Sequence, residues 1–204
     1  SDKRRELLQQ VSDLFVDGAS GHSDREAMLF GDVLSRLLTQ VPVADRVALA
    51  ERVAPLDRTP HDLAVRLAND ECAVAAPVLK HSPVLTDDDL IAVARSKGQD
   101  HLKAISMRST LSSNVTDVIV TRGDEDVLTT VARNPGASFS HTGFATLVEK
   151  AGHDCPICEA LAMRQDLPQG LASALMARLA PEARKRLAQL MEATPEQSEQ
   201  LLGR

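Results

Sequence analysis

The sequence predicts an all-α protein: a right-handed type of α-solenoid of about five stacked helical hairpins, with helical caps at both ends. Three observations predict it. The 204 residues are 43% hydrophobic but include no Trp, no Tyr and only four Phe, and a composition rich in Ala and Leu favours helix over strand. Apolar residues recur at i, i+3 and i+4, which is the spacing of one helix face. The chain also repeats itself with a period of about 27 residues.

The repeat is clearest where the second helix of each hairpin is expected to begin. The segment Thr86-Asp-Asp-Asp-Leu90 has counterparts that begin at Thr59, Ser112, Ser140 and Pro168, and the steps between them are 27, 26, 28 and 28 residues. The preceding helices agree, because residues 104–111 and 160–167 both read A-(I/L)-x-M-R-x-x-L. We therefore expect one continuous domain with hairpins at 45–70, 71–98, 99–123, 124–152 and 153–179.

Local signals mark the ends of these helices. Hydroxyl side chains are expected to act as N-caps at Thr86, Ser112 and Ser140. A first helical turn is expected at Pro60 and Pro168, and a C′ glycine at Gly98, Gly123 and Gly152. The three carboxylates after Thr86 suit the positive end of a helix dipole, and a metal site is the remote alternative. Residues expected to be buried between hairpins are Leu90, Val118, Leu147 and Leu175.

The two ends of the chain do not share the sequence pattern of the repeats. Residues 1–44 are expected to form an N-terminal cap of two longer helices, with a capping box at Ser23 and Glu26 before the second. Residues 180–204 are expected to form a C-terminal helix and a frayed tail. An exposed apolar stripe on these end segments would also suit a homodimer through the N-terminal helices.

Charge and composition exclude several classes of partner. A net charge of −6 and the shortage of aromatic residues argue against nucleic acid, since phosphates are bound by Lys and Arg and bases stack on aromatic rings. No apolar run approaches the roughly 20 residues that span a bilayer, so no membrane contact is expected. Three cysteines without framework spacing predict a cytoplasmic protein.

The most metal-like stretch is His153-Asp-Cys155-Pro-Ile-Cys158. A structural zinc site needs four ligands, and His153 with two thiolates leaves it one short. A redox motif of this kind normally follows a strand, which is not evident here. Incidental cysteines at a helix start are the favoured interpretation, with metal or redox chemistry as the alternative, so no cofactor is expected.

Two sets of polar residues are candidates for binding. Lys97, Gln99 and His101 stand between two hairpins, where they could hold an anionic group of a partner or simply end one helix. Arg108 and Arg164 recur at one repeat position, where they could line a ligand groove or bind carbonyl groups at a helix end. A paired carboxylate or a nucleophile at defined spacing is missing near Lys97, so no enzyme activity is expected.

A family resemblance covers almost the whole chain. Residues 13–15, 29–34, 94–102, 111–118 and 122–124 resemble the alphaproteobacterial domain-of-unknown-function family 2336. That resemblance implies a helical repeat protein and no particular activity. The hairpins are more loosely similar to HEAT repeats and to the leucine-rich repeat variant, which suggests a binding scaffold by analogy of fold.

The sequence therefore predicts a noncatalytic scaffold or adaptor for a protein partner, in bacterial signalling or regulation. Two alternatives stay open. One is a HEAT-like nucleic-acid-processing enzyme, which would need a basic face with aromatic residues. The other is a sensor of a small anionic ligand held in a groove.

Overall fold

The computed structural model describes residues 2–18, 21–152, 156–179, 181, 184–185 and 188–189. Within these residues the chain forms twelve α-helices and no strand, with one isolated bridge between Leu111 and Ala137. The prediction of an all-α protein is confirmed for this part of the chain. The helices are α1 (Asp2–Asp17), α2 (Asp24–Leu38), α3 (Val43–Val53), α4 (His61–Ala68), α5 (Cys72–His81), α6 (Asp87–Ser96), α7 (Gln99–Ser106), α8 (Ser113–Arg122), α9 (Glu125–Arg133), α10 (His141–Lys150), α11 (Pro156–Ala162) and α12 (Gln169–Met176).

Hydroxyl caps begin several helices where the sequence predicts them. The side chains of Thr86, Ser112 and Ser140 accept hydrogen bonds from backbone N–H groups in the first turns of α6, α8 and α10. Each bond satisfies one of the free N–H groups at a helix start. Asp87, Asp88 and Asp89 form the first turn of α6, so the acidic triad is a helix start.

The capping box before α2 is also present. The Ser23 hydroxyl accepts from the Glu26 N–H, and the Glu26 carboxylate accepts from the Ser23 N–H at 2.8 Å. These bonds hold the pKa of Glu26 below its usual range; the backbone bond contributes most. Pro60 and Pro168 differ from the prediction by one residue, because each is the N-cap residue itself and α4 and α12 begin one position later.

The predicted glycines stand at helix ends but in an unexpected conformation. Gly123 is the C-cap of α8, and Gly98 follows the C-cap of α6. Their φ angles are −65° and −85°, so neither adopts the left-handed conformation of a C′ glycine. At Gly123 packing explains the missing side chain, because an added Cβ would lie 2.8 Å from the Ile119 carbonyl oxygen and from Val127 Cγ1.

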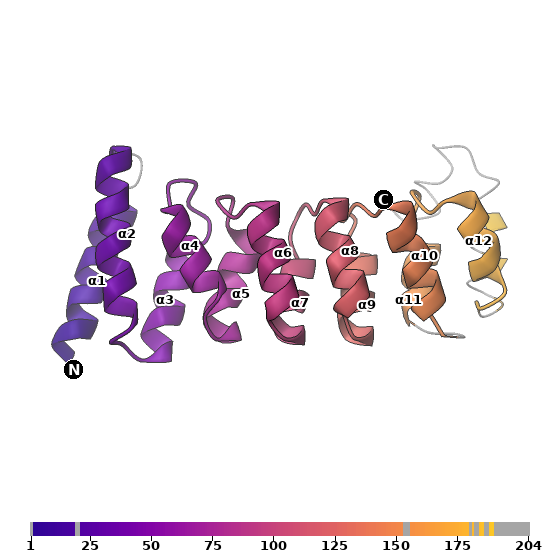
Figure 1. The fold of residues 1–204 in the computed structure, drawn as a ribbon, viewed down its shortest axis with the longest axis horizontal. Coiled ribbons are helices and arrows are strands. Elements are labelled where there is room, and N and C mark those ends of the chain that lie inside the picture. The colour runs from indigo at the N-terminus through magenta and orange to yellow at the C-terminus, as the bar shows by residue number, and fades with distance from the viewer. Residues whose placement is uncertain are drawn as a thin grey trace. The chain divides into compact units, whose positions relative to one another are not determined.

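The chain divides into two compact units, residues 1–108 and residues 109–204. In the first unit α1 packs against α2 and α3, α2 against α4, α5 against α3, α4 and α7, and α6 against α7. In the second unit α8 packs against α9 and α10, α9 against α11, and α12 against α10 and α11. Within each unit the helices therefore lie in two rows, one of odd and one of even number (Figure 1). The boundary between the units falls inside the predicted hairpin 99–123.

Burial largely follows the predicted register. Leu90, Leu147 and Leu175 are buried as predicted. Val118 is only half-buried, and the adjacent Ile119 is fully buried instead. The buried row of α8 is Val115, Thr116, Ile119 and Val120, which places position 118 at the edge of the helix face that meets the core.

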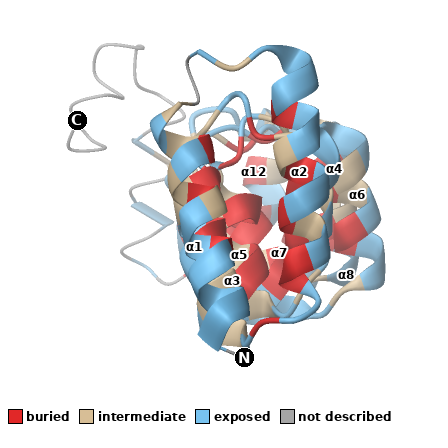
Figure 2. Cartoon of the chain, turned by 90° about the vertical axis from the view of Figure 1, so that its left-hand side faces the viewer, coloured by how far each residue is buried: buried red, intermediate tan, exposed pale blue. Residues whose placement is uncertain are grey.

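The N-terminal helices bury only some of their apolar side chains. Of the apolar residues on α2, Leu34, Leu37 and Leu38 are buried, whereas Met28, Leu29 and Val33 are exposed. On α1, Leu8 and Phe15 are buried and Leu7 and Leu14 are exposed. Figure 2 faces α1 and α2 and shows exposed ribbon along both.

Two predicted features fall on positions that are not described. Most of the predicted C-terminal segment 180–204 lies outside the described residues, as do His153 and Cys155. Among the helices that are described, none combines the length and apolar character needed to cross a bilayer.

Candidate functional site

The candidate residues Lys97, Gln99 and His101 lie at the junction of α6 and α7. Lys97 is the C-cap residue of α6, and Gln99 is the first residue of α7. Gln99 is exposed, Lys97 is half-buried and His101 is buried, with 8% of its surface exposed. Gly98 follows the C-cap residue of α6 and is itself the N-cap residue of α7.

Two of these side chains meet at the turn between α4 and α5. Lys97 Nζ donates to the carbonyl oxygen of Asn69 at 2.6 Å. His101 Nε2 donates to the carbonyl oxygen of Asp70 at 3.0 Å, because a carbonyl oxygen can only accept. Asn69 is the C-cap residue of α4, so both donors stabilise the negative end of that helix.

Arg46 of α3 binds the same turn and was not predicted. Its Nε lies 2.9 Å from Asp70 Oδ2 and its Nη2 lies 3.1 Å from Glu71 Oε1. Its Nη1 donates to the Val41 carbonyl oxygen at 3.3 Å. We call Arg46, Asp70, Glu71, Lys97 and His101 the turn cluster. Pairs that are 24 or 25 residues apart carry no local signal, so only the stacking of α3, α5 and α7 brings them together.

The turn cluster is arranged to hold a helix end. Its two carboxylates are bound by one guanidinium, and Lys97 and His101 are directed at backbone carbonyl oxygens. A general base needs a free lone pair directed at a substrate proton, and His101 Nε2 instead carries the proton that it donates. The geometry thus matches the helix-end alternative for Lys97, and a role of these residues in binding stays a prediction.

Arg108 makes the same kind of contact at another helix end. Its Nη1 donates to the Leu79 carbonyl oxygen at 2.7 Å, and its Nη2 to the Ser82 carbonyl oxygen at 2.9 Å. Ser82 is the C-cap residue of α5. Burial lowers the pKa of Arg108, and the charge of Asp87 opposes that effect.

Arg164 repeats this arrangement in the second unit. Its Nη1 donates to the Asn134 carbonyl oxygen at 2.8 Å, and its Nη2 to the Ala137 carbonyl oxygen at 2.7 Å. The guanidinium carbon lies 4.8 Å from the centre of the Phe139 ring, and Nη2 pairs with Asp166 at 2.6 Å. Arg108 and Arg164 therefore each bind a helix end within their own unit.

Two further cations cap helix ends and were missed. Lys150 Nζ donates to the carbonyl oxygens of Val120 and Thr121 at 2.7 and 2.8 Å. Arg178 donates to the carbonyl oxygens of Val148, Glu149 and Ala151, the last at 2.8 Å. A sequence signal exists, because Lys150 and Arg178 stand one 28-residue period apart.

One carboxylate of the acidic triad makes a contact between helices. Asp89 Oδ2 accepts from the Thr86 N–H and hydroxyl at 2.8 and 2.6 Å, and lies 2.8 Å from His61 Nε2. Burial acts to raise the pKa of Asp89, but the hydrogen bonds from Thr86 and His61 outweigh it and hold that pKa below its usual range. Asp89 thus joins the starts of α4 and α6. His61 and His141 are both exposed first residues of helices.

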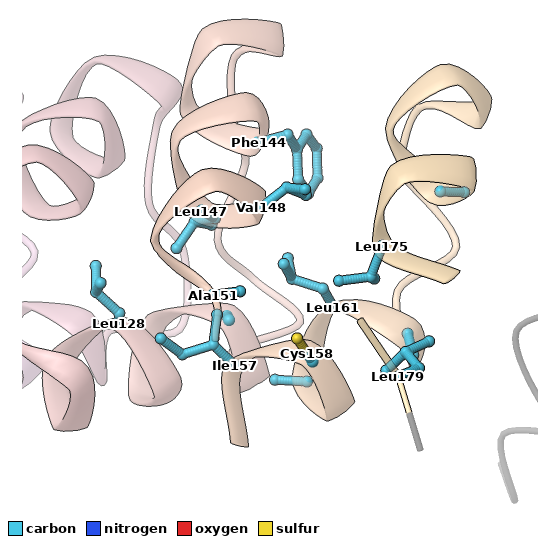
Figure 3. Close-up of a cluster of buried hydrophobic side chains, with 14 of the residues drawn as sticks. Leu128, Phe144, Leu147, Val148, Ala151, Ile157, Cys158, Leu161, Leu175 and Leu179 are labelled. Atoms are coloured by element: carbon cyan, nitrogen blue, oxygen red, sulfur yellow. The ribbon is translucent and has the colours of Figure 1, made fainter. Parts of the chain in front are cut away.

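Of the candidate ligands in the metal-like stretch, only Cys158 lies among the described residues. Its Sγ donates to the Gly152 carbonyl oxygen at 3.0 Å, and its side chain lies among Ile157, Leu161 and Leu179 (Figure 3). Across the described residues no three His, Cys, Asp or Glu side chains are close enough to hold a metal ion. At Cys72, burial raises the pKa of the thiol and Asp100 adds to the effect, which disfavours the reactive thiolate.

Comparison with known proteins gives one finding. No curated protein and no solved structure matches the chain significantly. A family model described as an uncharacterised protein conserved in bacteria (DUF2336) matches residues 74–204, which is more than half of the sequence and includes Lys97, His101, Arg108 and Arg164. The chain therefore belongs to the bacterial family DUF2336.

Proposed function

We propose that this protein is a noncatalytic scaffold that binds another protein chain, and that its hairpins form a HEAT-like α-solenoid. The two rows of helices within each unit support the solenoid. So does the recurrence in both units of a cation that caps a helix end of the preceding repeat. Single hairpins bury too little apolar surface to be stable alone, whereas stacked hairpins share one core.

The observation that carries the proposal is an exposed apolar surface on the α1–α2 hairpin. The exposed fractions of Leu7, Leu14, Leu29 and Val33 are 46, 64, 57 and 44%. Apolar side chains gathered on an exposed surface mark a site of interaction. We call Leu7, Val11, Leu14, Leu29 and Val33 the end face.

The polar candidates support a scaffold over the two alternatives. Lys97, His101, Arg108 and Arg164 donate to carbonyl oxygens of the chain itself. An anion sensor would direct such groups into a groove, and a nucleic-acid enzyme would direct them at phosphates. We also propose a cytoplasmic location with a role in bacterial signalling or regulation. The odd number of cysteines is the support for the location.

Site-specific photo-crosslinking in living cells tests the proposal. A photoreactive amino acid replaces Leu14 or Leu29, with Met107 as the matched control, since Met107 is also apolar and 46% exposed. We expect a crosslinked protein adduct from positions 14 and 29 and none from position 107. Adducts with nucleic acid, or no protein adduct from either end-face position, would contradict the proposal.

A further inference from the structure

The end face points away from the rest of its unit. On α1, Leu7, Val11 and Leu14 follow one another at i, i+4 and i+7, so they form one row. On the other side of α1, Arg5 pairs with Asp45 of α3 at 2.9 Å and Asp13 pairs with Arg52 of α3 at 2.6 Å. Each residue turns the helix by about 100°, which places the row of Leu7 and Leu14 roughly opposite the side that meets α3.

The exposed row of α2 is directed the same way. Gly31 is the point where α2 approaches α4, because a Cβ added there would lie 2.8 Å from Pro60, the N-cap residue of α4. Leu29 and Val33 lie about 160° around the helix from Gly31. The two exposed rows therefore lie on the same outward side of the hairpin and form one continuous apolar surface.

The row on α1 has a symmetric sequence. Leu7 stands three residues before Gln10, and Leu14 stands three residues after Val11. Arg4 stands six residues before Gln10, and Asp17 stands six residues after Val11; both are exposed. Two copies of α1 that cross antiparallel at Gln10 and Val11 would thus place Leu7 against Leu14, and Arg4 against Asp17, twice over.

The charges of α2 suit the same arrangement. Consecutive helices joined by a short turn run antiparallel, so Arg36 lies at the end of the hairpin that holds Arg4. Glu26, with Arg25 beside it, lies at the end that holds Asp17. A two-fold axis that reverses the helices sets Arg4 and Arg36 of one copy near the end that holds Asp17 and Glu26 in the other copy, where Asp24 and Arg25 also lie. Opposed charges of this kind fix the orientation of an interface.

We infer that the end face is a homodimer interface, in which a second copy of this chain packs antiparallel, α1 on α1 and α2 on α2. The same patch is used by both copies, as a two-fold interface requires. This inference rests on the proposed function and names the partner. Helices of 16 and 15 residues present about 24 by 20 Å per copy. The interface therefore totals roughly 1,000 Å², at the lower limit for specific complexes, and a micromolar Kd is expected.

The charge of α1 favours a second copy over a lipid surface. Helices that lie on membranes carry mainly Lys and Arg beside their apolar side. The sequence of α1 has four acidic and three basic residues, and the exposed Asp17 lies at the end of the apolar row. Anionic lipid would repel that end, whereas Arg4 of a second copy attracts it.

Sedimentation equilibrium of the full chain over about 1 to 200 µM tests the dimer. We expect the wild-type chain to be a dimer at the upper concentrations. Leu14→Arg puts a cation against Arg4 and Leu7 of the second copy, so it should raise the dimer Kd at least tenfold. The matched control Met107→Arg adds the same charge at another exposed methionine and should leave the Kd within about twofold.

Charge exchange identifies the second copy as the partner. Arg4→Asp alone and Asp17→Arg alone should each weaken the dimer, because each creates two like-charge pairs. The double variant restores both pairs and should recover the wild-type Kd within about threefold. These residues are exposed, and circular dichroism verifies that each variant keeps its helices.

Several outcomes would overturn the inference. They are a wild-type chain that stays monomeric at all concentrations, a double variant no tighter than the single ones, and wild-type binding to anionic phospholipid vesicles that Leu14→Arg abolishes. The crosslinking experiment separates the two proposals. An adduct of two copies of this chain supports both the scaffold and the homodimer. An adduct with a different protein supports the scaffold and contradicts the homodimer. The absence of any protein adduct contradicts both proposals.

Discussion

The ammonium group of Lys97, the C-cap residue of α6, lies 2.6 Å from the carbonyl oxygen of Asn69, the C-cap residue of α4. A positive charge on one helix end thus stabilises the negative end of the helix one repeat earlier. The same relationship joins Lys150 to the end of α8 and Arg178 to the end of α10. Each of these contacts joins a side chain of one repeat to the backbone of the preceding repeat.

Loss of the Lys97 ammonium should therefore lower stability. We expect Lys97→Met to reduce the free energy of unfolding by about 1–2 kcal/mol, because a hydrogen bond from a charged group to a helix end is lost. Urea unfolding followed by circular dichroism measures it. Arg95→Met is the matched control, since Arg95 is exposed on the same helix, and it should change stability by less than about 0.5 kcal/mol. Equal effects of the two changes would contradict a capping role.

We expect the forked shape of the Arg164 guanidinium to contribute more to the free energy of unfolding than its charge does. The guanidinium is directed at the carbonyl oxygens of Asn134 and Ala137, and its side chain is only 8% exposed. Arg164→Lys keeps the charge but cannot reach both carbonyl groups, so we expect a loss of about 2–3 kcal/mol. The exposed Arg133 of α9 provides the control, and Arg133→Lys should be nearly neutral. Thermal unfolding compares them, and a neutral Arg164→Lys would show that charge alone is enough.

Shortening single side chains of α8 to Ala tests which residues of this helix face the core. Ile119 is fully buried and Val118 is half-buried. We expect Ile119→Ala to cost about 2–5 kcal/mol and Val118→Ala less than about 1 kcal/mol. Chemical unfolding of both variants decides the point. The reverse order would mean that the helix is rotated by one position.

The contact of Asp89 should appear in the dependence of stability on pH. Its pKa is lowered by folding, so the stability it contributes is complete above the pKa of the unfolded chain. That stability is lost as pH falls through the lower pKa of the folded state. The difference in unfolding free energy between wild type and Asp89→Asn should thus be constant near pH 6 and shrink below about pH 4. Asp88→Asn controls for the loss of a charge in the same helical turn. A difference in unfolding free energy between wild type and Asp89→Asn that grows as the pH falls would contradict a lowered pKa of Asp89.

Features set by neighbouring residues could be predicted from the sequence. Ser23 with Glu26, and Thr86 with Asp89, form their caps within four positions, so short-range chemistry determines them. Pro60 was misplaced by one position, because the hydroxyl before it does not cap α4. Thr59 Oγ1 donates instead to the Val53 carbonyl oxygen at 2.7 Å, a contact that depends on how α3 ends.

The candidate site was predictable only in part. The recurrence of Arg108 and Arg164 at one repeat position pointed to a shared role, and both bind helix ends. Arg46 gave no such signal, because its partners Asp70 and Glu71 are brought near only by the packing of α3 against α5. The sequence suggested an exposed apolar stripe on the end segments but could not assign it to Leu7 and Leu14, since apolar residues at helical spacing are equally compatible with a buried helix face.

Radical footprinting of side chains tests most directly the proposal that a protein partner binds at the end face. The reactivity of Leu14 and Leu29 is measured in the free wild-type chain and in the complex that the wild-type chain forms with the partner identified by crosslinking, with the exposed Met107 and Met163 as internal references. We predict that Leu14 and Leu29 lose most of their reactivity in the complex, while both methionines keep theirs. Leucines that stay as reactive in the complex as in the free chain would contradict the account.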